Sequence, residues 1–118
     1  MNFTSENAEK VLAGTKTRTT RVQRDDNEVC RYVVGRTYAV CPGRTKSSVG
    51  RILVTNIRCY ADAYAFVCGM TRSERDAHGL AEGYVSYSEW WFDYARLCND
   101  PDGEKPCWVI DFELVKGG

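Results

Sequence analysis

The sequence has little of what marks several large classes of protein. Its 118 residues include one histidine and three prolines, and the formal net charge is zero. No apolar run is long enough to span a bilayer, so a membrane protein is not expected. The first ten residues, MNFTSENAEK, contain acidic side chains and no apolar stretch, whereas a secretory signal needs basic residues followed by an apolar segment. We therefore expect a cytoplasmic protein.

Residues that bind metal ions are too scattered to predict a metal site. The six cysteines form no C-x-x-C pair, and the single histidine, His78, has no cysteine within nine residues. We therefore expect no metal and no other cofactor. Cys41, Cys59 and Cys107 lie in or beside apolar, strand-like segments, where a reduced thiol behaves as a small apolar side chain. Reduced cysteines are the expectation, and one or two disulfides are the alternative.

The composition is typical of a globular protein. Hydrophobic residues make up 43% of the chain and charged residues 27%, and 118 residues is near the common size of one domain. We expect a single domain over residues 1–118. Residues 1–60 hold 11 Lys/Arg and 5 Asp/Glu, while residues 61–118 hold 5 and 11. Either the two halves neutralise each other in the fold, or the basic half forms a face for an anionic ligand such as RNA.

Local signals predict a helix at the N-terminus and a strand directly after it. Thr4 or Ser5 can cap the helix, and Gly14 is placed to end it. The segment TRTTRV, residues 17–22, is β-branched and alternating, which predicts a strand. Lys16 then lies at the corner between the helix and the strand, where it is free to point into a cleft.

Further strands are predicted along the rest of the chain. YVVGRTYAV, residues 32–40, reads as a strand interrupted by Gly35, and VGRILVTNIRCY, residues 49–60, has the length of a long central strand. CWVIDFELV, residues 107–115, predicts a closing strand. For ADAYAFVCGM, residues 61–70, another strand and a buried connection both remain open.

Two capping boxes predict consecutive helices between the central and the closing strands. Ser73 is followed three residues later by Asp76, and Ser86 is followed by Glu89. The second of these helices carries an aromatic and apolar stripe at helical period: Tyr87, Trp90, Trp91, Tyr94 and Leu97. We expect the stripe to be mainly core, with a base-stacking surface as the alternative. The order of elements predicts an α+β fold, a small mixed β-barrel with helices over an opening.

Several segments resemble one known family. Gly14, Lys16 and Arg21 fit the pattern GxKxxxxR of the ASCH domain family. In the same order as in bacterial and phage members, NFTSENAEKVLAG precedes that pattern, and YVVGRTYAVCPGR, VGRILVTNI, ERDAHGLAEGYVSYSEWW and CWVIDFELV follow it. The resemblance covers nearly the whole chain and implies a PUA-like mixed β-barrel. We expect about five to six strands, one N-terminal helix and two consecutive helices before the last strand.

The resemblance also implies a ligand and a reaction. PUA-like barrels commonly bind RNA or modified nucleosides, and one branch of the family hydrolyses the acyl amide of N4-acetylcytidine. Carried over by motif, its catalytic residues correspond to Lys16, Thr19 and Glu82. A threonine hydroxyl is a weak nucleophile and needs a nearby base, and a lysine can be that base only if its pKa is lowered. Burial and the positive charge of Arg18 or Arg21 both act in that direction.

A wider set of residues is predicted to bind the ligand. It comprises the glycine and arginines of the motif, an aromatic residue and the basic side chains of the following loop: Gly14, Arg18, Arg21, Tyr38, Arg44, Lys46 and Arg51. The expected partner is RNA or a nucleoside, with the protein a monomer or a weak homodimer. A non-catalytic RNA-binding module and a metal-dependent ribonuclease are the alternative functions. His78 lies in the polar segment DAHGLAEG, and we expect it to be exposed and dispensable.

Overall fold

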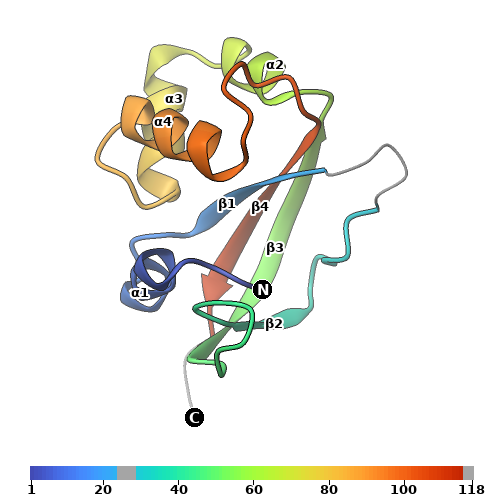
Figure 1. Cartoon of the computed structure of the whole chain (residues 1–118), viewed down its shortest axis with the longest axis vertical. Coiled ribbons are helices and arrows are strands. Elements are labelled where there is room, and N and C mark those ends of the chain that lie inside the picture. Colours follow the sequence, from blue (N-terminus) through green and yellow to red (C-terminus); the bar gives the residue numbers. More distant parts are fainter. Residues whose placement is uncertain (24–28, 116–118) are drawn as a thin grey trace.

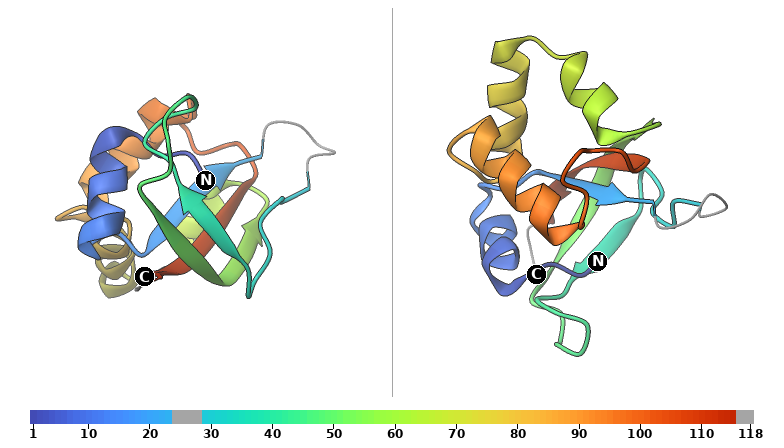
Figure 2. Two further views of the ribbon diagram at one scale, coloured as in Figure 1. Left: turned by 90° about the horizontal axis from the view of Figure 1, so that it is seen from below. Right: turned by 45° about the horizontal axis from the view of Figure 1, so that its top comes forward.

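A single antiparallel sheet organises the structure, a computed structural model that describes residues 1–23 and 29–115 (Figure 1). Its strands lie in the order β1 (Arg18–Val22), β4 (Cys107–Leu114), β3 (Gly50–Tyr60) and β2 (Thr37–Val40). The sheet curls into a half-barrel, as both views in Figure 2 show. The predicted α+β fold is confirmed. The closing strand lies in the middle of the sheet, beside the first strand of the chain.

The pairing of β3 with β4 forms the centre of the sheet. Its register runs from Ile52 opposite Leu114 to Tyr60 opposite Cys107, with one irregularity between Val54 and Asn56. The side chains of Ile52 and Val54 on β3 are fully buried, as are those of Val109 and Ile110 further along β4. The prediction of a long central strand over residues 49–60 is therefore confirmed, and its alternation is explained by burial of one face.

Helix α1 (Ser5–Ala13) begins and ends where its capping residues predict. The Thr4 hydroxyl accepts a hydrogen bond from the Asn7 amide, and Gly14 closes the helix in the left-handed region at φ 79°. The Gly14 N–H donates to the carbonyls of Lys10 and Val11. Glycine adopts this left-handed conformation at the lowest energetic cost because it has no Cβ. Ala8 and Val11 pack the buried face of α1 against the sheet core.

Residues 1–3 extend the half-barrel beyond β2. The Phe3 amide donates to the Cys41 carbonyl at 2.8 Å, and the Cys41 amide donates to the Met1 carbonyl at 3.0 Å. On the other side, the Arg21 guanidinium of β1 donates to the Asn2 carbonyl at 2.7 Å. The N-terminal segment thus bridges the two edge strands, joined to β2 by backbone bonds and to β1 by a side chain.

Helices α2 (Ala63–Cys68), α3 (Arg72–Ala81) and α4 (Tyr87–Leu97) gather at the end of the sheet that lies away from β2 (Figure 1). α2 and α4 share a core with β4 that contains Phe66, Trp90 and Tyr94. Trp90 and Tyr94 stack at a centroid distance of 5.4 Å. The aromatic stripe of α4 is therefore mainly core, as predicted, although Leu97 is about half exposed.

The structure assigns two segments in more detail than the sequence does. Residues 61–70, for which a strand and a buried connection were both open, contain α2, because Asp62 caps a helical turn by accepting from the Ala65 amide. The segment 32–40 is interrupted at Gly35, as predicted: it turns at Val34 and Gly35, with Gly35 at φ 90°, and Thr37–Val40 alone forms a strand. For these two reasons the described residues form four strands rather than five or six, and three helices precede the last strand.

The start of α3 is also two residues earlier than the sequence predicts. Thr71, not Ser73, is the N-cap: its hydroxyl accepts from the Glu74 amide at 3.2 Å, and the Glu74 carboxylate accepts from the Thr71 amide at 3.0 Å. Both spacings fit a capping box, so the pattern alone does not distinguish them. Within residues 1–23 and 29–115, no helix has the length and apolar character to cross a membrane.

Replacement of the two candidate caps provides a matched test. Thr71→Ala removes one capping bond and should lower the free energy of unfolding by about 1 kcal/mol. Ser73→Ala, at an exposed position inside the helix, should change it by less than about 0.5 kcal/mol. Urea denaturation followed by circular dichroism measures both. A larger loss for Ser73→Ala than for Thr71→Ala would contradict the assigned helix start.

Candidate functional site

The site begins at the corner between α1 and β1. After Gly14 the amides of Thr15 and Lys16 both donate to the Lys10 carbonyl, at 3.0 and 3.1 Å, so the chain turns sharply before the strand starts. This turn directs the Lys16 side chain into the protein, where only 4% of the residue remains exposed. The predicted placement of Lys16 off the strand is confirmed.

Glu82 lies directly opposite, at the end of α3. Its carboxylate accepts from the Lys16 ammonium at 2.9 Å through Oε1, and its backbone carbonyl accepts from the same ammonium at 3.0 Å. The next residue, Gly83, has φ 92°, and a Cβ there would lie 3.2 Å from Lys16 Cβ. Glycine therefore lets α3 end in close contact with the Lys16 corner.

Thr20, which is not among the predicted site residues, completes the contacts of Glu82. The Thr20 hydroxyl donates to Glu82 Oε2 at 2.6 Å. Thr19 is also buried, and it lines the same small space as Lys16 and Glu82. Both neighbouring threonines of β1 thus reach the site, one bound to the carboxylate and the other on the wall.

His78 contacts the other side of Glu82, one helical turn earlier on α3. Its Nε2 lies 3.3 Å from Glu82 Oε2, and its Nδ1 lies 3.1 Å from Arg18 Nη1. Arg18 in turn pairs with Asp111 at 2.5 Å. His78 is completely buried, so the expectation of an exposed residue is wrong. The polar neighbours of His78 in the sequence face solvent, whereas its own position faces the core.

The electrostatics of the cluster favour an ionised Glu82. Burial by itself raises the pKa of this carboxyl, but the Lys16 ammonium, His78 and the Thr20 hydroxyl outweigh burial and lower the pKa to about 2. Burial lowers the pKa of the Lys16 ammonium, and the charge of Glu82 opposes that shift. Lys16 is therefore easier to deprotonate than a surface lysine, while Glu82 is harder to protonate than a surface glutamate.

The cluster forms one wall of a small space, here called the inner chamber, that adjoins a larger one, here called the outer pocket. The inner chamber has a volume of about 60 Å³, and its lining includes Lys16, Thr19, Thr20 and Glu82. The outer pocket, of about 640 Å³, shares five lining residues with it. These shared residues come from α1, β1 and the end of α4: Asn7, Thr19, Thr20, Leu97 and Cys98. A ligand in the outer pocket could therefore extend a small group into the inner chamber.

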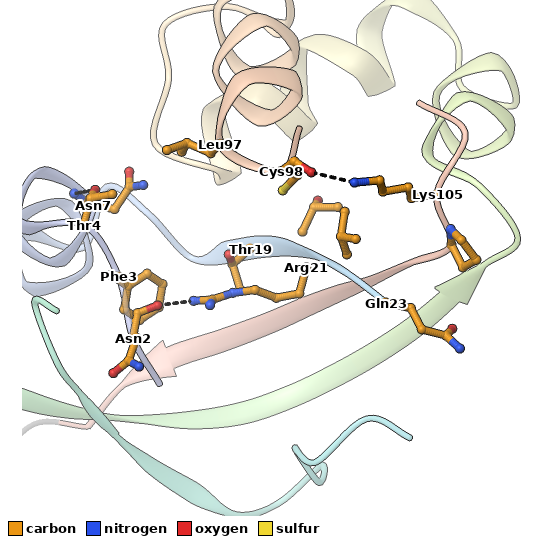
Figure 3. A pocket seen from close by; sticks show the side chains of 13 residues that line it. Asn2, Phe3, Thr4, Asn7, Thr19, Arg21, Gln23, Leu97, Cys98 and Lys105 are labelled. Atoms are coloured by element: carbon orange, nitrogen blue, oxygen red, sulfur yellow. Dashed lines mark hydrogen bonds between the residues drawn. The ribbon is translucent and has the colours of Figure 1, made fainter. Parts of the chain in front are cut away.

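The outer pocket is lined by basic and neutral side chains. Arg21 and Lys105 are its charged residues, and none of the described residues that line it is acidic. Figure 3 shows Arg21 on β1 reaching Asn2, with Lys105 across the pocket bound to the Cys98 carbonyl. The Arg21 Nε is buried without a hydrogen-bond partner among the described residues. The pocket is thus suited to an anionic or polar ligand.

Most of the predicted ligand-binding residues lie elsewhere. Arg21 lines the outer pocket, but Arg18 is engaged with Asp111 and His78. Gly14 closes α1 and makes no part of the lining. These residues of the motif shape the corner that holds Lys16, and among them only Arg21 faces the pocket.

The remaining four predicted residues belong to β2, to the turn after it and to β3. The Tyr38 hydroxyl accepts from the Val33 amide at 2.7 Å. Arg51 is exposed and donates to the Thr37 hydroxyl at 3.1 Å. Arg44 and Lys46 are exposed in the turn after β2. None of these four predicted residues lines the outer pocket or the inner chamber.

Sequence reasoning missed several residues that do line the site. Besides Thr20, they include a polar residue of α1, an aromatic residue before α4, two residues at the end of α4 and a lysine before β4: Asn7, Tyr84, Leu97, Cys98 and Lys105. His78 was also missed, although it contacts Glu82 and does not line either space. One available signal was the spacing of His78 and Glu82, because residues four apart lie on the same face of a helix. No local signal connects the segment around Cys98 with β1.

Comparison with solved structures identifies the fold. An ASCH domain from Lactobacillus crispatus superposes on this chain with a TM-score of 0.65 at 14% sequence identity, over 92% of this chain and 70% of the other. This chain has the ASCH-domain fold. A mutant ASCH protein of Zymomonas mobilis gives a TM-score of 0.59 at 13% identity, over 98% and 69% of the two chains. A protein of Enterococcus faecalis gives 0.64 at 18%, over 95% and 74%.

The likeness is one of fold, because the sequence identities are low. No protein-family model and no curated protein matches the sequence. In this ASCH fold, residues 1–23 and 29–115 contain no group of three or more His, Cys, Asp or Glu side chains placed to hold a metal ion. They also contain no disulfide bond. The buried cluster around Glu82 is thus the main concentration of ionisable groups inside the described fold.

The ion pair predicts strong coupling between its two members. Lys16→Met leaves a buried carboxylate without its cation, and Glu82→Gln leaves a buried ammonium without its anion, so each should lower the free energy of unfolding by about 3–5 kcal/mol. The double variant leaves neither charge and should be much more stable than the sum of the single losses implies. Urea denaturation of the four proteins measures the coupling. Additive losses would mean that the two charges do not interact.

The lowered pKa of Glu82 predicts a pH window for the stability that this carboxylate provides. A folded-state pKa of about 2 lies below the unfolded value, so the contribution is complete above about pH 5 and is lost as pH falls toward 2. The difference in unfolding free energy between wild type and Glu82→Gln should therefore shrink over this range. Urea midpoints at several pH values measure it. A constant difference would contradict the lowered pKa.

Proposed function

We propose that this protein binds RNA or a modified nucleoside in the outer pocket and hydrolyses the acyl amide of an N4-acylated cytidine. The observation that carries the proposal is the buried Lys16–Glu82 pair at the wall of the inner chamber, with Thr19 on the same wall. The resemblance to the amidohydrolase branch of the ASCH family implies that its lysine, threonine and glutamate correspond to these residues, which supports the proposal. A chamber of about 60 Å³ suits a group the size of an acetyl.

Lys16 is the proton carrier in this proposal. Two of the three N–H bonds of its ammonium point to Glu82, through Oε1 and the backbone carbonyl, which leaves the third for a ligand. Because burial lowers the pKa of Lys16, its neutral amine is more accessible than that of a surface lysine and can accept the Thr19 proton. Glu82, with a pKa of about 2, is a poor proton donor and instead holds Lys16 in place.

The reaction then proceeds as an acyl transfer. The Thr19 oxygen attacks the acyl carbon while its proton passes to Lys16. The carbon–nitrogen bond breaks, the N4 nitrogen takes the proton from Lys16, and cytidine leaves. Water, deprotonated by Lys16, hydrolyses the ester on Thr19, releasing the carboxylic acid and restoring the hydroxyl. Before a ligand binds, the Thr20 hydroxyl donates to Glu82 and orients the carboxylate, and Thr20 is not the attacking group in this proposal.

The outer pocket favours a second candidate, an RNA-binding module without turnover. Its two cations and the absence of acidic side chains among its described lining residues suit a phosphate. Such a module would bind RNA with an affinity that falls steeply as salt concentration rises.

Mass spectrometry of N4-acetylcytidine incubated with the purified protein tests the proposed reaction. Wild type should release cytidine, Lys16→Met should lower kcat/KM at least about 100-fold, and Thr19→Val should do the same. Lys46→Met is the matched control, because Lys46 is an exposed lysine outside the pocket, and it should retain wild-type activity. Thr20→Val separates the two threonines and should lose less activity than Thr19→Val.

Further outcomes decide between the candidates. The same incubation with a short single-stranded RNA, with and without Mg²⁺, reports cleavage, which would favour a ribonuclease. No turnover of either substrate, combined with salt-dependent binding of the RNA that Arg21→Ala weakens, would favour the binding module. Thr20→Val more damaging than Thr19→Val would reassign the attacking hydroxyl.

A further inference from the structure

A chain of polar contacts runs from the sheet to Glu82 through His78. Arg18 Nε donates to Asp111 Oδ1 at 2.5 Å, and Arg18 Nη1 lies 3.1 Å from His78 Nδ1. His78 Nε2 then lies 3.3 Å from Glu82 Oε2. The four residues come from β4, β1 and α3, so the chain connects the centre of the sheet with the carboxylate at the end of a helix.

The contact with Arg18 determines which nitrogen of His78 carries the proton. A guanidinium has only donors, so His78 Nδ1 must be the acceptor in this contact. The ring proton is then on Nε2, on the side that faces Glu82. Arg18 is itself held by Asp111, which also lies 3.7 Å from Arg58. The tautomer is thus fixed by a side chain that is anchored independently of the site.

The Nε2–H group is a buried donor without a well-aligned acceptor. His78 is fully buried, and its Nε2 makes no hydrogen bond in the described part of the chain although Glu82 Oε2 is only 3.3 Å away. That oxygen already accepts from the Thr20 hydroxyl at 2.6 Å. Buried donors rarely remain unpaired in folded proteins. The missing hydrogen bond between His78 Nε2 and the nearby carboxylate therefore needs a physical explanation.

The surroundings of His78 leave Glu82 as the natural acceptor. Its ring packs between Phe66 of α2, at a centroid distance of 5.0 Å, and Trp90 of α4, at 4.2 Å. Neither of these side chains titrates. The charged groups in contact with the ring are Arg18 from β1 and Glu82 from α3 itself, with Lys16 and Asp111 bound to their far sides.

We propose that His78 is a positioning residue that holds a reserve hydrogen bond for Glu82. While the site is empty, the Thr20 hydroxyl occupies Glu82 Oε2. When Thr20 turns toward a ligand, a small rotation of the carboxylate brings Oε2 onto the Nε2–H group of His78. Glu82 thereby stays ionised and stays paired with Lys16 through the reaction. The role rests on the proposed function, since it serves the carboxylate that holds the proton carrier.

The tautomer can be measured without any substrate. His78 is the only histidine, so long-range ¹H–¹⁵N correlation spectra of the protein labelled with ¹⁵N-histidine report two ring nitrogens without ambiguity. In wild type, Nδ1 should resonate as an unprotonated nitrogen and Nε2 as a protonated one. Arg18→Leu should abolish this preference and give a mixture. Nδ1 found protonated in the wild-type protein would overturn the proposal, whether or not the variant folds.

A second variant tests the reserve bond directly. Thr20→Val keeps the shape of the side chain but removes its hydroxyl, which leaves Glu82 Oε2 open. The Nε2 proton of His78 should then shift downfield and exchange more slowly with water, as expected for a newly formed bond to a carboxylate. Thr19→Val, which removes the neighbouring hydroxyl that does not contact Glu82, is the matched control and should leave this proton unchanged. An unaltered Nε2 proton in Thr20→Val would disprove the reserve bond.

Kinetics separate a positioning role from a merely structural one. With N4-acetylcytidine as substrate, His78→Phe should lower kcat about tenfold with little change in KM. His78→Gln should restore most of that loss, because its amide can donate from the position of Nε2. Equal losses in both variants would refute positioning. Failure of the wild-type protein to act on this substrate would overturn the proposed function alone, since the spectra of His78 do not depend on it.

Discussion

The ion pair between Lys16 and Glu82 is the contact on which the rest of the site depends. Removing two charges from water is costly, and the attraction between them offsets that cost only when the geometry is good and the remaining polar groups are paired. Here the Thr20 hydroxyl and the backbone carbonyl of Glu82 provide such partners. The pair joins the corner after α1 to the end of α3, which are distant in the sequence. Because both residues line the inner chamber, the pair also fixes the position of that wall.

Three local features position the other lining residues around the Lys16–Glu82 pair. Gly14 turns the chain from α1 into β1, and Gly83 lets α3 end against Lys16. Asp100 organises the segment after α4: its buried carboxylate accepts from the amides of Glu104 and Lys105. Lys105 is thereby presented to the pocket. Each feature involves only a few residues. Together they bring segments that are far apart in the sequence into one site.

The sequence predicts those parts of the structure that local signals control. The caps of α1 and the alternation of β3 are such signals, and the structure agrees with both. Where two spacings fit equally well, as at Thr71 and Ser73, the pattern could not choose between them. The choice between Thr19 and Thr20 was harder still, because it depends on where Glu82 arrives from another element. His78 was misjudged because the polarity of its sequence neighbours says nothing about the one position that faces inward.

Strand β1 forms one edge of the sheet beside the outer pocket. β1 pairs with β4 along one side only, and its residues line the outer pocket from Thr19 to Val22. An edge strand carries backbone N–H and C=O groups that its ladder does not use. In the proposed function, a bound nucleoside would lie beside these backbone groups. Alanine substitution leaves backbone groups in place, so alanine scanning of the pocket would register only the part of the affinity that side chains provide.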